Sequence, residues 1–358
     1  MSGQEVIEHK GEGASGGTQP MIFSFGDAES VLDRSELSSY FEVWHNNRWY
    51  EPPLPMDRLA RSFNMSPHHR SAIALKVNLL VAHHQPSRWL PADDFERFAM
   101  DFLQMGNGYL EWVPNMAGRL AGAKVALARH VRRGTKPGQY WFVTGPMGSL
   151  DHEFARDTVY HLQQPDVAQE IYGLPEWLSA LQSGLLNENA TLFRRRYYLN
   201  GAHTGFILYV SEPLIDTETA KAIEEKIKSA KGVGNFKNLF VNVPGGKKDG
   251  IQLMNVGEAA AKDEFTNVKS ISRDDLLAAH RVPPQLIGII PTNNGGFGKV
   301  GEALDTFVEI EIVPLARRMI RMNDWFGMKV LAFRNYTCSN GDQIEIETGR
   351  RILAASAR

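Results

Sequence analysis

The spacing of apolar residues along the chain predicts both helices and strands. Apolar side chains recur every three or four residues, as on one face of a helix, over residues 94–103, 175–199, 217–231, 258–281 and 300–326. Short apolar or aromatic runs bounded by turn residues predict strands at residues 40–44, 109–113, 139–143, 205–210, 238–243, 251–256, 329–333 and 343–348. The chain is therefore expected to have an α+β fold.

Cap and breaker residues set the expected helix ends. Pro175 suits a first helical turn, and Asn200-Gly201 follows the last turn of the same helix. In the helix at 258–281, Ser272 and Asp275 form a capping signature, which predicts an interruption near Ser272. The pair Pro283-Pro284 should stop that helix, because proline disfavours helix in the residue before it.

The long helix at 300–326 is distinguished by a proline and by the order of its charges. Pro314 should kink it near its middle. Acidic residues occupy the first half and basic residues the second, an order that complements the helix dipole: Glu302, Asp305, Glu309 and Glu311, then Arg317, Arg318 and Arg321. The same dipole argument is one explanation for Arg194, Arg195 and Arg196, near the end of the helix at 175–199.

Composition places the chain among ordinary folded proteins. With 358 residues, of which 43% are hydrophobic, it can bury a core and form roughly two domains of about 150 residues each. The net charge of −2 does not indicate a protein that grips many phosphates. The single cysteine, Cys338, excludes an intrachain disulfide and a metal site built from several cysteines, and it fits a reducing compartment.

The chain contains no segment that predicts membrane insertion. Residues 1–20 are polar and rich in Gly, and they are expected to form a disordered arm and not a signal peptide. The uncharged stretch at 282–298 contains three prolines and an Asn-Gly cluster, which argue against a spanning helix.

The glycine-rich segment at 296–301 matches the pattern G-x-G-x-x-G, but not the context of a dinucleotide site. Pro291, Thr292, Asn293 and Asn294 lie between it and the apolar run before it, and no strand with an acidic end follows about 20 residues later. A phosphate-binding loop is excluded as well, since Val300 stands where Ser or Thr must reach magnesium. From the residues alone, the segment is a flexible connector between two helices.

No set of residues predicts catalysis or metal binding. The pairs His68-His69 and His83-His84 have no cysteine or carboxylate at zinc-like spacing, so they are expected to be surface or core histidines. The sequence contains no G-x-S-x-G or H-E-x-x-H motif, and Cys338 has no evident base. The chain is therefore predicted to be no enzyme and to use no cofactor or metal.

Several long sequence motifs resemble one family. They are VLDRSEL, YEPPLP, GNGYLEW, YGLPEWLSAL, LNENATLFRRRYYLNGAHTGFILYV and AAAKDEFTNVKSISRDDLLAAHRVPPQLIGIIPTNNGGFGK. These motifs look like those of the portal proteins of tailed bacteriophages, in the subfamily called PBSX-like. The resemblance covers roughly residues 23–327.

This resemblance implies a multi-part portal fold. Its expected parts are a disordered arm at 1–22, a wing at 23–174, a first stem helix at 175–199, a small αβ clip at 200–257, a second stem helix at 258–282, a channel loop region at 283–299, a long kinked helix behind that loop at 300–327, and closing strands with a tail at 328–358.

The resemblance also implies site residues. The channel loop that meets DNA would contain Asn293, Asn294, Gly295, Gly296, Phe297, Gly298 and Lys299. Docking of the packaging motor would use Lys247, Lys248 and Asp249 in the clip. Arg194, Arg195 and Arg196 would lie on the stem, and Pro314 would form the helix kink.

The implied function is that of a head–tail connector. Copies of the chain, usually twelve, would form a ring at one capsid vertex, conduct double-stranded DNA during packaging and ejection without sequence specificity, and dock the large terminase subunit. Further implied partners are the major capsid, scaffolding and neck or tail completion proteins, and no membrane. The protein would be assembled in the bacterial cytoplasm and reside in the virion. Two alternatives are a nucleotide-dependent enzyme using residues 296–301, and another ring-forming virion adaptor.

Overall fold

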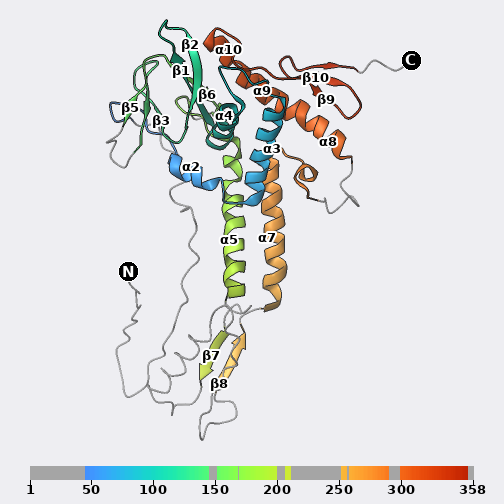
Figure 1. Cartoon of the computed structure of the whole chain (residues 1–358). Helices are drawn as coiled ribbons and strands as arrows, with labels where there is room; N and C mark the ends of the chain where they lie inside the picture. The colour runs from blue at the N-terminus through green and yellow to red at the C-terminus, as the bar shows by residue number, and fades with distance from the viewer. Residues whose placement is uncertain are drawn as a thin grey trace, which may run out of the picture.

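A body of helices and small sheets stands at one end of a two-helix stem (Figure 1). The structure, a computed structural model, describes residues 45–144, 151–167, 169–199, 206–210, 251–255, 258–289 and 299–353. Within this part of the chain, no helix is both long enough and apolar enough to span a bilayer.

The body begins with three helices that precede a three-stranded antiparallel sheet. The helices are α2 (Met56–Ser62), α3 (Pro67–His83) and α4 (Ala92–Met105), and the sheet has the order β2-β1-β6, with β1 (Asn107–Pro114), β2 (Leu120–Ala126) and β6 (Val159–Gln163). Helix α4 confirms the helix predicted at 94–103. Its buried residues Phe95, Phe98 and Phe102 lie on one face, so the helix packs that face into the core.

Gly106 makes the turn from α4 into β1. Its φ of 70° is left-handed, and its N–H donates to the Phe102 carbonyl over 2.9 Å, which closes the helix. An added Cβ would lie 2.6 Å from the carbonyl carbon of Leu174, so the backbone that leads into the stem runs directly against this turn. A side chain at residue 106 would push the two segments apart.

The body contains a second small sheet. It has the order β3-β4-β5, with β3 (Val131–Arg133), β4 (Tyr140–Phe142) and β5 (His152–Glu153), and all its pairs are antiparallel. Tyr172 lies against it: its hydroxyl donates to the Tyr50 carbonyl over 2.5 Å and accepts from the Arg133 N–H over 2.9 Å. The strand predicted at 139–143 is confirmed by β4, whereas that at 40–44 lies outside the described residues.

The stem consists of two long helices that lie side by side (Figure 1). The 3₁₀ turn η1 (Glu176–Ala180) leads into α5 (Leu181–Leu199), and α7 (Glu258–Ala279) returns to the body. Beyond the far ends of these helices, β7 (Phe206–Val210) pairs with β8 (Ile251–Asn255) in antiparallel register, as predicted for 205–210 and 251–256. The helix predicted at 217–231 and the strand at 238–243 lie outside the described residues.

The predicted interruption of the second stem helix at Ser272 is wrong, because α7 runs without a break from Glu258 to Ala279. The Ser272 hydroxyl accepts a hydrogen bond from Asn187 Nδ2 on α5 over 2.9 Å and donates to the Lys269 carbonyl of its own helix. A serine that caps a helix must instead accept from its own backbone. Here the hydroxyl is used between the two helices, so no new helix start forms.

The long helix predicted at 300–326 is divided into four segments. They are α8 (Val300–Phe307), the π-helical turn η3 (Val308–Ile312), α9 (Val313–Ile320) and, after Arg321, α10 (Met322–Phe326). The π turn stands directly before Pro314, which lies at the start of α9. Phe307, Val308, Ile312 and Met319 are buried against the helices of the body, which makes this chain of segments part of the main core.

A third antiparallel sheet closes the C-terminal part, with the order β11-β10-β9, comprising β9 (Tyr336–Thr337), β10 (Gln343–Glu345) and β11 (Arg350–Ile352). The strand predicted at 343–348 is shorter than expected. The strand predicted at 329–333 is reduced to an isolated antiparallel bridge between Phe333 and His84, because the side chain of Asn323 takes up the backbone groups of Val330 and Leu331. Asn323 Oδ1 accepts from the N–H groups of Val330 and Leu331, each over 2.8 Å, and Nδ2 donates to the Leu331 carbonyl.

Candidate functional site

The structure describes only part of the predicted site. Asn293 to Gly298 of the channel loop, and Lys247, Lys248 and Asp249 of the docking turn, lie outside the described residues. Lys299 stands directly before α8, and its Nζ lies 2.6 Å from Glu302 Oε1 on the exposed surface. Arg194 and Arg195 are exposed on the last turns of α5, and the side chain of Arg196 is outside the described part.

The residues described before the glycine-rich motif do not form the strand that precedes a dinucleotide site. Residues Pro284–Ile287, which precede it, form the 3₁₀ turn η2 and not a strand. Gly301 lies in the first turn of α8, where an added Cβ would meet the Ser339 Cβ at 3.1 Å. The last glycine of the motif therefore allows α8 to pack closely on the turn that carries Ser339.

The second stem helix ends in a left-handed residue that is not glycine. Arg281 has a φ of 56°, and the two hydrogen bonds of a Schellman cap form around it: Val282 N to Leu277 O at 3.0 Å and Arg281 N to Ala278 O at 2.9 Å. Glycine is the usual residue there because it has no Cβ. The cost of an arginine in this conformation indicates that its side chain has a use.

The Arg281 side chain joins the end of α7 to two other elements. Its Nε donates to Glu311 Oε2 over 2.6 Å and its Nη2 to Glu311 Oε1 over 3.2 Å, in a fork on one carboxylate of the π turn. Nη2 also donates to Glu176 of η1. Hydrogen bonding to Glu311 raises the pKa of the Arg281 guanidinium. This one side chain therefore contacts the beginning of the first stem helix and the π turn.

Lys76 of α3 extends these contacts into the body. Its Nζ lies 2.6 Å from Glu311 Oε1, and the two side chains are only 3% and 9% exposed. Burial lowers the pKa of Lys76, which the Glu311 charge partly offsets. Burial alone would raise the pKa of Glu311, but hydrogen bonds from Arg281 and Lys76 hold it below its usual value. We call Lys76, Glu176, Arg281 and Glu311 the junction network.

The junction network lines a cavity of about 190 Å³ between the stem and the body. Gln164, at the end of the β1–β6 sheet, donates from Nε2 to Glu176 Oε1 over 2.8 Å and accepts from Arg318 of α9. Arg318 and Glu311 belong to consecutive segments of the same long helix. The long helix thus contacts the stem directly through Glu311, which bonds Arg281, and indirectly through Arg318 and Gln164.

Beside the junction network lies a buried pair of histidines. His69 Nδ1 is 2.9 Å from His280 Nε2, and His69 Nε2 is 3.1 Å from Gln104 Oε1. Burial lowers the pKa of His69 to about 4 and that of His280 well below its usual value, so both are neutral at pH 7. These are core histidines, and no group of three or more metal-binding side chains occurs among the residues that the structure describes.

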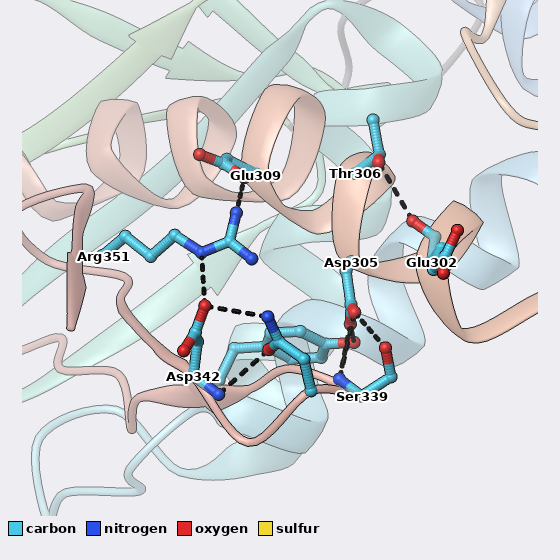
Figure 2. Close-up of polar contacts among 9 residues, drawn as sticks. Glu302, Asp305, Thr306, Glu309, Ser339, Asp342 and Arg351 are labelled. Carbon is cyan, nitrogen blue, oxygen red and sulfur yellow. Dashed lines mark hydrogen bonds and ion pairs between the residues drawn. The ribbon is translucent and has the colours of Figure 1, made fainter. Parts of the chain in front are cut away.

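The opposite side of α8 is held by the C-terminal sheet (Figure 2). Asp305 accepts from the Tyr336 hydroxyl over 2.7 Å and from the Ser339 hydroxyl over 2.5 Å. Arg351 bridges Glu309 Oε2 at 3.3 Å and Asp342 Oδ2 at 3.1 Å. The C-terminal sheet therefore holds α8 at Asp305 and the π turn at Glu309.

Sequence reasoning missed the junction network, although a signal was present. Lys76 interrupts the apolar run AIALKVNLLVA, and Glu311 interrupts VEIEIV. A lone charge in such a run is expected to be paired when buried. The sequence does not show which residues pair with Lys76 and Glu311.

Comparison with known proteins shows the family of the chain. Residues 76–342 match the family described as phage portal protein. The chain is 43% identical over 321 residues to a probable portal protein of Escherichia phage P2, covering 90% of this chain and 93% of that protein. It is 34% identical over 274 residues to a probable portal protein of Haemophilus phage HP1 (strain HP1c1), covering 75% and 79%. The chain belongs to the phage portal protein family.

Solved structures share the fold. The neck of an empty gene transfer agent particle, computed with C6 symmetry, aligns with a TM-score of 0.58 at 18% identity and covers 81% of this chain and 86% of that chain. An HK97 family phage portal protein from Corynebacterium diphtheriae aligns with a TM-score of 0.56 at 13% identity, covering 77% and 94%. The predicted α+β portal fold is therefore confirmed. As a portal protein, the chain is a subunit of the head–tail connector.

Proposed function

We propose that copies of this chain form a ring at one vertex of the capsid, through which double-stranded DNA enters and leaves the head. We assign twelve subunits by analogy with a similar neck structure computed with C12 symmetry. The ring is part of the virion, is assembled in the host cytoplasm, and carries no catalytic activity of its own. We also place the chain in the PBSX-like subfamily, on the sequence motifs described above.

The feature that carries this proposal is the two-helix stem in a member of the portal family. The two helices extend from the body (Figure 1), and such a pair buries only one face of each helix. Large apolar side chains on this stem are partly exposed. Leu186 and Phe193 of α5 are 49% and 41% exposed, and Ile271 of α7 is 62% exposed. Such side chains on an extended stem are consistent with a surface that neighbouring subunits cover.

Negative-stain electron microscopy of the purified protein tests the ring. We expect rings with a central channel wide enough for duplex DNA. Protein that stays monomeric or dimeric at high concentration would contradict the proposal.

We further propose that residues 293–299 touch the passing DNA. Lys299 offers a charge for transient phosphate contact, and the near-neutral chain suits a channel in which DNA must slide. Replacing Phe297 and Lys299 with Gly should leave the rings intact and lower the yield of filled heads. Normal yields would remove the DNA role from this segment.

The partners we propose at the far end of the stem are the packaging motor and its large terminase subunit, with Lys247, Lys248 and Asp249 as contacts. At the capsid, the proposed partners are the major capsid, scaffolding and neck or tail completion proteins. Reversing the charge at Lys247 and Lys248 should weaken terminase binding in a pull-down from purified components. Unchanged affinity would exclude these lysines.

A further inference from the structure

The π turn η3 lies between two sets of hydrogen bonds and ion pairs, which are made by different faces of one helix. On its N-terminal side, α8 bonds to the C-terminal sheet through Asp305, and the turn itself does so through Glu309. On its inner side, Glu311 bonds to Lys76 and Arg281. Ile310, between the two carboxylates, is 63% exposed. The turn therefore distributes neighbouring side chains to opposite partners.

A π turn differs from an α turn by one residue. Its signature bond is present, because the N–H of Val313 donates to the Val308 carbonyl five residues earlier. Pro314, which has no N–H, cannot supply the α-helical bond that would compete with this pattern. Converting the turn to α geometry would rotate α8 about its axis by roughly 100° relative to α9, since each α-helical residue turns by that angle.

The bonds of Glu311 oppose this conversion. The carboxylate is 9% exposed and accepts from the Lys76 ammonium and from the Arg281 guanidinium. A rotation would remove it from both cations and leave charges buried without partners, which is costly. Arg281 is in turn fixed at the end of α7, where its left-handed backbone permits little adjustment.

We propose that Glu311, Arg281 and Lys76 are positioning residues, whose ion pairs hold the π turn and thereby fix the rotational setting of α8 and Lys299 relative to stem helix α7. A displacement of the end of α7 changes the position of Arg281 and so biases the π turn. The setting of α8 follows from the contacts alone. Only its consequence for DNA rests on the proposed channel function.

The close approach of Gly301 to Ser339 provides a reporter of that setting. A Cβ at Gly301 would lie 3.1 Å from the Ser339 Cβ, so the pair G301C and S339C is within a few tenths of an ångström of disulfide spacing. Cys338, the one natural cysteine, is buried next to Ser339. The reporter chain therefore also carries Cys338→Ala, so that one disulfide is possible within a chain.

The decisive measurement is the rate of oxidative cross-linking in this reporter chain. We expect rapid disulfide formation in the parent and a rate about tenfold lower in the double variant Lys76→Met, Glu311→Met. This rate corresponds to about one molecule in ten keeping residues 301 and 339 side by side. The double change removes both buried charges and leaves neither without a partner. Glu302→Gln, which removes the surface pair with Lys299 on the same helix, is the matched control and should match the parent.

A second variant keeps the test decisive if the double variant does not fold. Arg281→Met affects a side chain that is half exposed and leaves the Lys76–Glu311 pair in place. It too should slow cross-linking while thermal melting remains cooperative. A rate within twofold of the parent in a folded variant, either the double variant or Arg281→Met, would overturn the proposal.

The effect of these variants on DNA packaging is measured separately. Variants that slow cross-linking should still form rings by negative-stain microscopy but package less DNA. Normal packaging with slowed cross-linking would refute the DNA consequence and leave the positioning role intact. Absence of rings from the parent protein would refute the proposed function, and the cross-linking result would still decide the positioning role.

Discussion

Asn187 on α5 donates a hydrogen bond from Nδ2 to Ser272 Oγ on α7 over 2.9 Å, inside the interface of the two stem helices. The two residues are 2% and 1% exposed, and the Ser66 hydroxyl lies 3.4 Å from Asn187 Oδ1. A buried polar pair in a helix interface favours one register over the others, because any shift leaves buried polar groups without partners. Together with the exposed bond from the Ser183 hydroxyl to Asp275 Oδ2 at 2.7 Å, this contact favours one relative height of α5 and α7.

Replacing Asn187 with Ala should lower the free energy of unfolding by about 1–3 kcal/mol, because it leaves the buried Ser272 hydroxyl without its donor. Urea denaturation followed by circular dichroism measures this. The matched control is Asn189→Ala, the same substitution at an exposed position of α5, which should change stability by less than about 0.5 kcal/mol. Equal effects of the two substitutions would contradict the role given to Asn187.

Gly106 and Gly118 provide a matched pair for backbone crowding. Both are left-handed, with φ of 70° and 73°, but a Cβ at Gly106 would meet the Leu174 carbonyl carbon at 2.6 Å, whereas a Cβ at Gly118 would meet nothing within 4 Å. Gly118→Ala should cost about 1 kcal/mol from backbone strain alone. Gly106→Ala should cost clearly more, because the segment before the stem must also move. Thermal melting of both variants checks this, and similar melting temperatures would count against the crowding.

The burial of His84 predicts that the free energy of unfolding depends on pH. Its side chain is 2% exposed and packs on Phe95, with the two ring centroids 4.4 Å apart. Neither ring nitrogen of His84 has a hydrogen-bond partner within the described part of the chain. Burial lowers its pKa to about 4, whereas the unfolded chain takes up the proton near pH 6.5. The unfolded state therefore binds more protons between these values, and stability must fall as the pH is lowered through this range.

Replacing His84 with Met should remove this contribution. The variant should be more stable than the parent at pH 5, with a smaller gain at pH 7.5, because an apolar side chain suits the site and does not titrate. Melting temperatures at the two pH values measure the difference. The exposed His152, replaced by Gln, is the control for an unspecific effect of removing a histidine. An equal gain for His84→Met at both pH values would contradict the titration argument.

Glu311→Met should lower the free energy of unfolding more than Lys76→Met does. Glu311→Met leaves the 3% exposed Lys76 without its carboxylate, and a loss of about 3–5 kcal/mol is expected for a broken buried pair. Lys76→Met leaves Glu311 with Arg281 at 2.6 Å, so its loss should be smaller. Urea denaturation of the two single variants tests the order. The reverse order would show that Arg281 does not compensate the Glu311 charge.

The helices of the stem and α4 could be predicted because their signals are local. Phe95, Phe98 and Phe102 recur at helical spacing before Gly106, and the structure has α4 and its left-handed cap there. Helix α3 was not predicted, because the polar residues His69 and Lys76 lie on its buried face and interrupt the apolar stripe. The Ser272 cap was predicted wrongly, since the same hydroxyl serves a contact with Asn187 that no local pattern reveals.

The junction network and the π turn could not be read from the sequence for different reasons. Lys76 and Glu311 are 235 positions apart, and pairing across such a separation is a property of the fold. The π turn adds one residue to a helix whose apolar spacing still fits an ordinary α-helix, so Pro314 predicted a kink and not a change of helix type. The predicted DNA-channel and docking roles remain predictions for the experiments described above.

The antiparallel pairing of β7 and β8 has a consequence for how relatives of this protein could diverge. Val210 lies opposite Ile251, so the residues on either side of the segment 211–250 are neighbours in the sheet. Segments whose ends are adjacent can change in length at a small loop-closure cost. Residues 211–250 could therefore be exchanged between phages as a cassette, which would adapt one end of the molecule to a new partner while α5, α7 and the body retain their packing.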